Sequence, residues 1–131
     1  MTFAVRHVSI AINRPFGEVY EFASNPENLP KWAAGLSSSI GMVDDDWVAE
    51  TAAGPVRVKF AERNEFGVLD HYVTTASGES IYNPLRVLGN GDGAEVVFTL
   101  YRREGMDASS FDADAAAVDQ DLHTLKRLLE A

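Results

Sequence analysis

Three polar side chains, Glu62, His71 and Asn83, lie in stretches that are otherwise rich in β-branched and aromatic residues. A carboxylate beside an imidazole can move a proton onto or off a substrate, because its charge supports the protonated ring. Such chemistry suits cyclisation, dehydration or isomerisation. The same groups can instead only orient a ligand in an apolar pocket. The choice depends first on which face of a sheet each side chain occupies.

The strand predicted at Val56–Asn64 alternates between apolar and charged residues. Successive side chains of a strand point to opposite faces, so the apolar set, which includes Phe60, marks the inward face. Glu62 has the same parity as Phe60. We therefore expect the Glu62 carboxylate to point inward.

The next predicted strand, Val68–Thr75, contains Asp70 and His71 side by side. A tight turn between the two strands places Phe60 opposite His71, and directly paired residues share a face. His71 is then expected to point inward, diagonal to Glu62, whereas Asp70 faces water. This register predicts an inward Glu62–His71 pair drawn from two strands.

The orientation of Asn83 depends on the turn that precedes its strand, predicted at Ser80–Leu88. An odd-length turn or a bulge places Asn83 inward, whereas a two-residue turn sends Tyr82 and Arg86 inward, because a slip of one residue reverses every side chain. The apolar alternation of the following strand favours an inward Asn83.

Changes of period along the chain predict the elements that position these residues. Phe3–Ile12 alternates like a half-buried strand, and two short helices that contain proline follow it. Apolar residues spaced by three and four predict a long helix near Ala108–Glu130. Further strands are predicted at Ser37–Val43, Trp47–Ala52, Val56–Asn64, Val68–Thr75, Ser80–Leu88 and Ala94–Arg103.

This order predicts a single α+β domain over residues 1–131. One curved antiparallel sheet of about seven strands, wrapped around the long C-terminal helix, would bury both apolar surfaces. The two short helices after the first strand would close one end.

The segment Val8 to Trp32, "VSIAINRPFGEVYEFASNPENLPKW", combines a strand, a helix with an early proline and a terminal tryptophan. With the element order of the whole chain, it resembles the START-like helix-grip superfamily, also called SRPBCC. The stretches "FGVLDHYV" and "GESIYNPLRVLGNGDGAEVVFTL" resemble small bacterial members grouped with polyketide cyclases. The resemblance implies a cavity between sheet and long helix that suits a mostly apolar ligand. The superfamily has no universal catalytic motif, so no site is carried over from it.

The predicted ligand is a small hydrophobic or aromatic molecule. Acid–base catalysis resembling that of the polyketide cyclase-like members would use Glu62 and His71. The residues expected to line the cavity are Trp32, Phe60, Val73, Asn83, Leu85, Phe98, Val118 and Leu122. Two alternatives stay open: a non-enzymatic carrier or sensor of lipid-like metabolites, and a protein-interaction module resembling the chaperone-ATPase activators.

The composition argues against several other kinds of binding partner. The net charge is −9 and the longest basic runs are pairs, so we expect no nucleic-acid binding. There is no cysteine and the three histidines lie on separate elements, so we expect no metal site and no cofactor. No apolar run approaches the roughly 20 residues of a membrane helix, so no membrane insertion is expected. The lack of a signal-peptide pattern favours the cytoplasm, and homodimer formation is left open.

Overall fold

The computed structural model describes residues 1–33 and 38–131. Its elements in chain order are β1 (Val5–Ile12), α1 (Phe16–Ala23), the 3-10 turn η1 (Pro26–Asn28), α2 (Leu29–Trp32), β2 (Ser39–Val43), β3 (Asp46–Thr51), β4 (Gly54–Phe60), β5 (His71–Thr74), β6 (Ser80–Asn83), β7 (Leu85–Asn90), β8 (Gly93–Tyr101) and α3 (Ala108–Glu130). The predicted start of the second strand, Ser37, lies outside the described residues.

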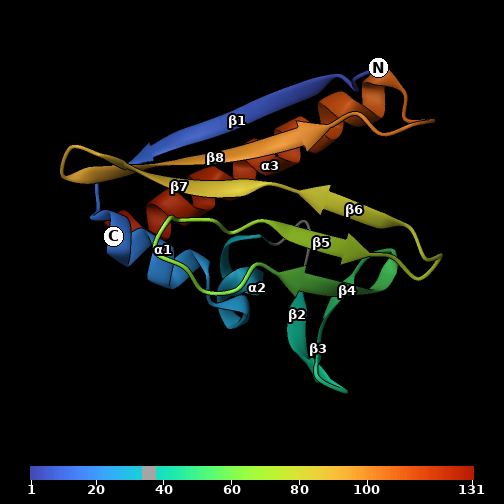
Figure 1. Ribbon diagram of the computed structural model, residues 1–131, viewed down its shortest axis with the longest axis horizontal. Coiled ribbons are helices and arrows are strands. Elements are labelled where there is room, and N and C mark those ends of the chain that lie inside the picture. Colours follow the sequence, from blue (N-terminus) through green and yellow to red (C-terminus); the bar gives the residue numbers. More distant parts are fainter. Residues whose placement is uncertain (34–37) are drawn as a thin grey trace.

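The strands form two antiparallel sheets, whereas the sequence predicted one. The first sheet has the order β1-β8-β7 and the second the order β2-β3-β4-β5-β6 (Figure 1). The strand predicted at Ser80–Leu88 is interrupted at Pro84, which has no backbone N–H to donate to a neighbouring strand. On either side of Pro84, β6 pairs with β5 and β7 pairs with β8.

Residues 67–70 lie against residues 85–87 and join the two sheets beside this break; we call this junction the seam. Two backbone hydrogen bonds, each 2.8 Å long, cross it: Leu69 N–H to the Leu85 carbonyl and Val87 N–H to the Gly67 carbonyl. The seam therefore fixes how far the two sheets diverge.

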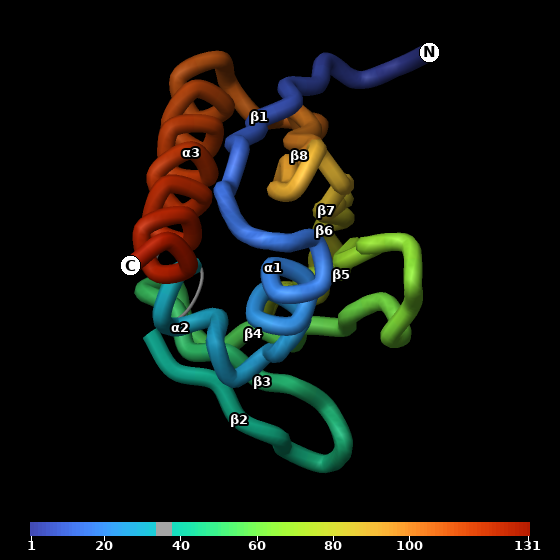
Figure 2. Tube along the Cα trace, turned by 90° about the vertical axis from the view of Figure 1, so that its left-hand side faces the viewer, coloured from blue at the N-terminus to red at the C-terminus, as the bar shows by residue number. Residues whose placement is uncertain are grey.

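Helix α3 has the bounds that the sequence predicted. Asp107 caps its first turn, because the carboxylate accepts a 2.7 Å hydrogen bond from the Ser110 N–H. Figure 2 shows α3 along one side of the molecule beside β1, with α1 and α2 below it at one end. The buried side chains of α3 are Phe111, Leu122, Leu125 and Leu129. The long helix and the two short ones thus enclose the concave side of the sheets.

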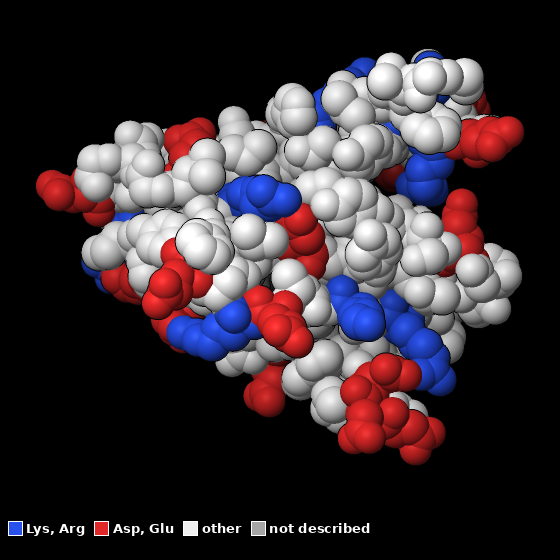
Figure 3. Space-filling view, viewed as in Figure 1, with Lys and Arg blue, Asp and Glu red and all other residues white. Residues whose placement is uncertain are grey.

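The surface carries charges of both signs. Lys and Arg side chains are interspersed with Asp and Glu over the face in Figure 3. The acidic group at its lower tip lies over the β2–β3 turn, where Asp44 and Asp45 have positive φ values. No helix in the described part of the chain is long and apolar enough to cross a membrane.

Candidate functional site

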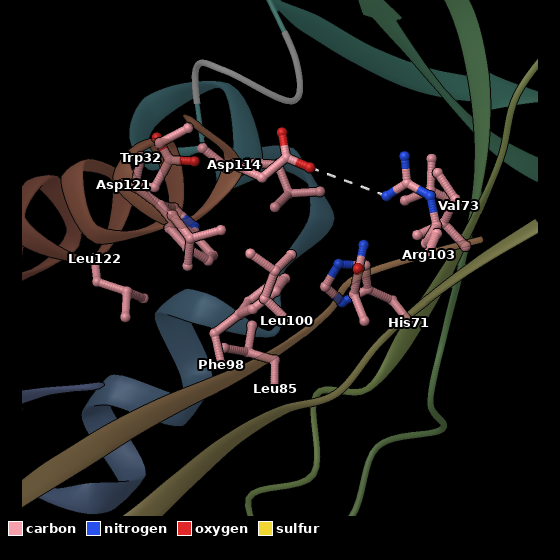
Figure 4. Close-up of a pocket in the computed structure, with 16 residues that line it drawn as sticks. Trp32, His71, Val73, Leu85, Phe98, Leu100, Arg103, Asp114, Asp121 and Leu122 are labelled. Atoms are coloured by element: carbon pink, nitrogen blue, oxygen red, sulfur yellow. Dashed lines mark ion pairs between the residues drawn. The ribbon is translucent and has the colours of Figure 1, made fainter. Parts of the chain in front are cut away.

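A pocket of about 220 Å³ lies between the sheets and α3. Its wall is mostly apolar and includes His71 and seven of the residues predicted to bind ligand: Trp32, Val73, Asn83, Leu85, Phe98, Val118 and Leu122. Figure 4 shows Trp32 and Leu122 at one end, and His71, Val73 and Arg103 at the other. Their role in ligand binding stays a prediction.

His71 opens β5 and pairs with Phe60 on one neighbouring strand and with Asn83 on the other. Only 5% of its surface is exposed, and it is the one polar residue among the buried residues of the described chain. The inward orientation that strand parity predicted for His71 is confirmed.

The hydrogen bond of His71 fixes which ring nitrogen carries hydrogen. Its Nδ1 lies 3.0 Å from the carbonyl oxygen of Leu69, and a carbonyl only accepts, so Nδ1 must donate. Burial lowers the pKa of His71 below 6.5, although the bond to Leu69 and the charge of Asp70 oppose this change. The ring is therefore mainly neutral at pH 7, and its Nε2 accepts no hydrogen bond from the residues that the structure describes.

Two aromatic rings flank this imidazole. The ring centroids of Phe60 and Phe98 lie 5.8 and 6.3 Å from that of His71. Phe98 lines the pocket, but Phe60, also predicted as a lining residue, does not. Phe60 borders a separate hollow of about 90 Å³ near Tyr20. Phe60 therefore contacts His71 as its partner on the neighbouring strand but does not border the pocket.

The Glu62 side chain is exposed whereas His71 is buried, so the prediction of an inward pair is wrong. Strand β4 ends at Phe60, and the Glu62 side chain beyond it is exposed. The pairing of β4 with β5 ends at Phe60 and His71, and beyond it side chains no longer alternate between the two faces of the sheet. The strands predicted at Val56–Asn64 and Val68–Thr75 are correspondingly shorter than expected.

The side chain of Asn64 explains why the pairing of β4 with β5 stops. Its side-chain oxygen accepts hydrogen bonds from the N–H groups of Phe66 and Val68, and its amide donates to the carbonyls of Glu62 and Val68. Asparagine side chains offer the backbone this alternative to strand pairing. The Asn64 N–H is bound in turn by the Tyr20 hydroxyl at 2.9 Å.

Asn83 lies directly opposite His71 and lines the pocket, so its predicted inward orientation is confirmed. The turn before its strand has an odd length: three residues separate Thr75 from Glu79, whose carbonyl accepts the Thr75 N–H at 2.9 Å. Tyr82 is exposed on the outer face, which excludes the alternative register.

Asp70 points to the outer face, as predicted, but its side chain is only 15% exposed. Its carboxylate accepts two hydrogen bonds from Arg86, at 2.8 and 2.7 Å, one from the Leu85 N–H at 3.0 Å and one from the Tyr82 hydroxyl at 3.1 Å. The Arg86 hydrogen bond is the main reason why the pKa of Asp70 is lowered. Sequence parity gave the face but not this network.

Three charged residues of the pocket wall were not predicted from the sequence: Arg103, Asp114 and Asp121. Arg103 Nη1 lies 4.0 Å from Asp114 Oδ2, drawn as a dashed line in Figure 4, and its Nε lies 3.7 Å from Glu79 Oε2. A signal was present: Asp121 lies seven positions after Asp114, a spacing that puts both on one face of a helix.

Within the described residues there is no group of three or more His, Asp or Glu side chains placed to hold a metal ion. The pocket therefore offers a ligand a polar end formed by His71, Asn83 and Arg103, two carboxylates from α3 and a wall that is otherwise apolar.

No known protein-family model matches the chain. No curated protein matches it either. Solved structures do, at low identity. An uncharacterized protein from Bacillus thuringiensis is 12% identical with a TM-score of 0.78, over 98% of this chain and 100% of that one.

Two further structures share the fold. DynU16, a protein of the dynemicin biosynthetic locus, is 16% identical with a TM-score of 0.71, and the match covers 97% of this chain but 47% of DynU16. Ara h 8.0201 is 11% identical with a TM-score of 0.67, over 96% and 97% of the two chains. At these identities the likeness shows the fold alone: mixed α+β, antiparallel sheets and a long C-terminal helix, of the helix-grip type.

Proposed function

We propose that the chain binds a small aromatic molecule bearing a hydroxyl group in the pocket between the sheets and α3. The observation that carries the proposal is the neutral His71 ring in a mostly apolar wall, whose Nε2 has no donor among the described residues and can accept the hydroxyl hydrogen. Buried acceptors usually have a donor, and in this pocket a ligand would supply it.

The size of the pocket supports a compact ligand. An apolar cavity of roughly 150 Å³ is enough to hold benzene, so a pocket of about 220 Å³ suits one or two fused rings. Phe98 and the aliphatic side chains around it would contact the ring faces.

Proton transfer is a second candidate function, favoured by the same neutral imidazole. A neutral histidine in a site screened from water can take a proton from an acidic O–H or C–H group. Because Glu62 is exposed and does not line the pocket, His71 would act as a single base, which suits enolisation or isomerisation. The origin of DynU16 in a biosynthetic locus supports a search for the ligand among biosynthetic aromatic compounds.

A carrier and an enzyme share this pocket but differ in what happens to the ligand. Native mass spectrometry separates them: a co-purified molecule that stays unchanged on incubation supports a carrier, and its conversion supports an enzyme. An interaction module needs no internal space, so the pocket argues against that alternative.

The binding proposal is tested with 2-naphthol and 2-methoxynaphthalene, which differ in the ability to donate a hydrogen. Titration calorimetry should show 2-naphthol binding about tenfold more tightly, the contribution of one buried hydrogen bond. The His71→Phe variant keeps an aromatic ring but has no acceptor, and its preference should fall to about twofold or less. His123→Gln, on the exposed side of α3, is the matched control. Equal binding of both probes by the native chain, or an unchanged preference in His71→Phe, would overturn the proposal.

A further inference from the structure

Arg103 differs from the other arginines of the described chain. Every other arginine side chain donates a hydrogen bond: Arg6, Arg14, Arg57, Arg63, Arg86, Arg102 and Arg127. Arg103 donates none to the residues that the structure describes, and only 33% of its side chain is exposed. A guanidinium that donates no hydrogen bond to a described residue has its five N–H groups available for a ligand.

Arg103 lies where the pocket meets a second hollow. This outer hollow, of about 400 Å³, is bordered by Phe3, Tyr82 and Tyr101. The two spaces share four wall residues: Ile81, Asn83, Leu100 and Arg103. They meet in the gap between β6 and β8, which belong to different sheets, and Figure 3 shows the surface hollowed near the ends of these strands.

The present partners of Arg103 hold it weakly. Its closest approaches, 3.7 Å to Glu79 and 4.0 Å to Asp114, are too long for hydrogen bonds. The two carboxylates are 54% and 45% exposed, so water screens both ion pairs. A ligand group with better geometry could replace them at little cost.

We propose that Arg103 binds the carboxylate of a hydroxylated aromatic acid, whose ring lies in the inner pocket and whose acid group lies at the junction with the outer hollow. The inference rests on the proposed function and names the ligand class for it. Guanidinium and carboxylate match each other in a planar, two-bond arrangement. Figure 4 shows His71 and Arg103 at the same end of the pocket, so one ligand end can meet both.

The net charge of −9 opposes an anionic ligand at long range. Salt screens charges beyond about 8 Å at physiological ionic strength, so the outcome depends on the charges at the junction itself, where Arg103 lies beside Glu79 and Asp114. Binding should accordingly strengthen when salt is raised from a very low concentration.

The test compares 2-naphthoate with its neutral analogue 2-naphthamide by titration calorimetry. The native chain should prefer 2-naphthoate. Arg103→Gln should weaken 2-naphthoate binding about tenfold and change 2-naphthamide binding by no more than about twofold. Arg57→Gln removes the same charge from the outer side of β4, where Arg57 pairs with Asp46, and should leave both affinities within about twofold.

The failures of the two proposals are distinguishable. If the native chain binds the neutral probe normally but Arg103→Gln does not weaken 2-naphthoate, the Arg103 inference is wrong and the proposed function stands. An equal loss in Arg57→Gln would also overturn it, since the effect would then be general charge. If neither probe binds the native chain, the proposed function fails and the inference with it.

Discussion

Asp70 and His71 are neighbours in sequence but lie on opposite sides of the sheet, in contrasting environments. The Asp70 carboxylate accepts four hydrogen bonds on the outer side, from groups of the seam and its surroundings. The His71 ring, on the inner side, donates a hydrogen bond to Leu69, has no second one with a described residue and lines a mostly apolar pocket.

The residues around Asp70 and those around His71 show the same contrast. On the outer side, polar groups are used to join the two sheets. On the inner side, Arg103 donates no hydrogen bond to a described residue, and the buried Nε1 of Trp32 also has no acceptor there. An unpaired buried polar atom costs stability, so the Nε1 of Trp32 and the guanidinium of Arg103 indicate where a ligand could supply hydrogen-bond partners.

The largest expected effect comes from breaking the seam at Gly67. Its φ of +74° favours glycine, and an added Cβ would lie 2.1 Å from the Val87 carbonyl oxygen. Gly67→Ala should therefore lower the free energy of unfolding by about 3 kcal/mol or more, measured in urea.

The control is Gly89→Ala in β7, where no atom lies within 4 Å of an added Cβ. This variant should stay within about 1 kcal/mol of the native chain. Similar stabilities for the two variants would show that the seam tolerates movement, contrary to our account.

Asp70→Ala should have the next largest effect, a loss of about 2 kcal/mol in the free energy of unfolding, because it leaves the seam groups unpaired. Asp46→Ala breaks an ion pair with Arg57 whose two side chains are more than half exposed, and should cost less than about 1 kcal/mol. The pKa of Asp70 is lowered on folding, so its stabilising effect is present above 3.8 and lost as the pH falls through the lower value. Equal losses of unfolding free energy in the two variants at pH 7 would show that the Asp70 network at the seam stabilises the fold no more than an exposed ion pair does.

The sequence was sufficient for what depends on local pattern. The apolar spacing predicted α3 to its bounds, and strand alternation predicted the opposite faces of Asp70 and His71. It was insufficient where a side chain replaces strand pairing. Asn64 binds the backbone beyond β4, so the position of Glu62 in the alternating pattern did not predict its orientation. Pro84 divided one predicted sheet into two, and only the three-dimensional arrangement placed Arg103 at the pocket.

His71 should produce a smaller, pH-dependent effect. Its pKa is lowered on folding, so the unfolded chain takes up a proton below 6.5 before the folded chain does. The native chain should therefore lose up to about 1.4 kcal/mol of unfolding free energy per pH unit below 6.5, relative to His71→Phe. Urea unfolding at pH 7 and pH 5 measures this difference.

The exposed variant His123→Gln keeps His71 and should retain the native pH dependence. If His71→Phe loses as much stability as the native chain between pH 7 and pH 5, His71 is not the group responsible, and its neutral state in the folded protein would be in doubt.

The most direct test of the account is the ¹⁵N NMR spectrum of the His71 ring at pH 7, with and without 2-naphthol. We predict a hydrogen on Nδ1 and none on Nε2 in the free protein, and a change in the Nε2 resonance when the probe binds. A hydrogen on Nε2 in the free protein, or an Nε2 resonance that does not move at a saturating probe concentration, would contradict the account.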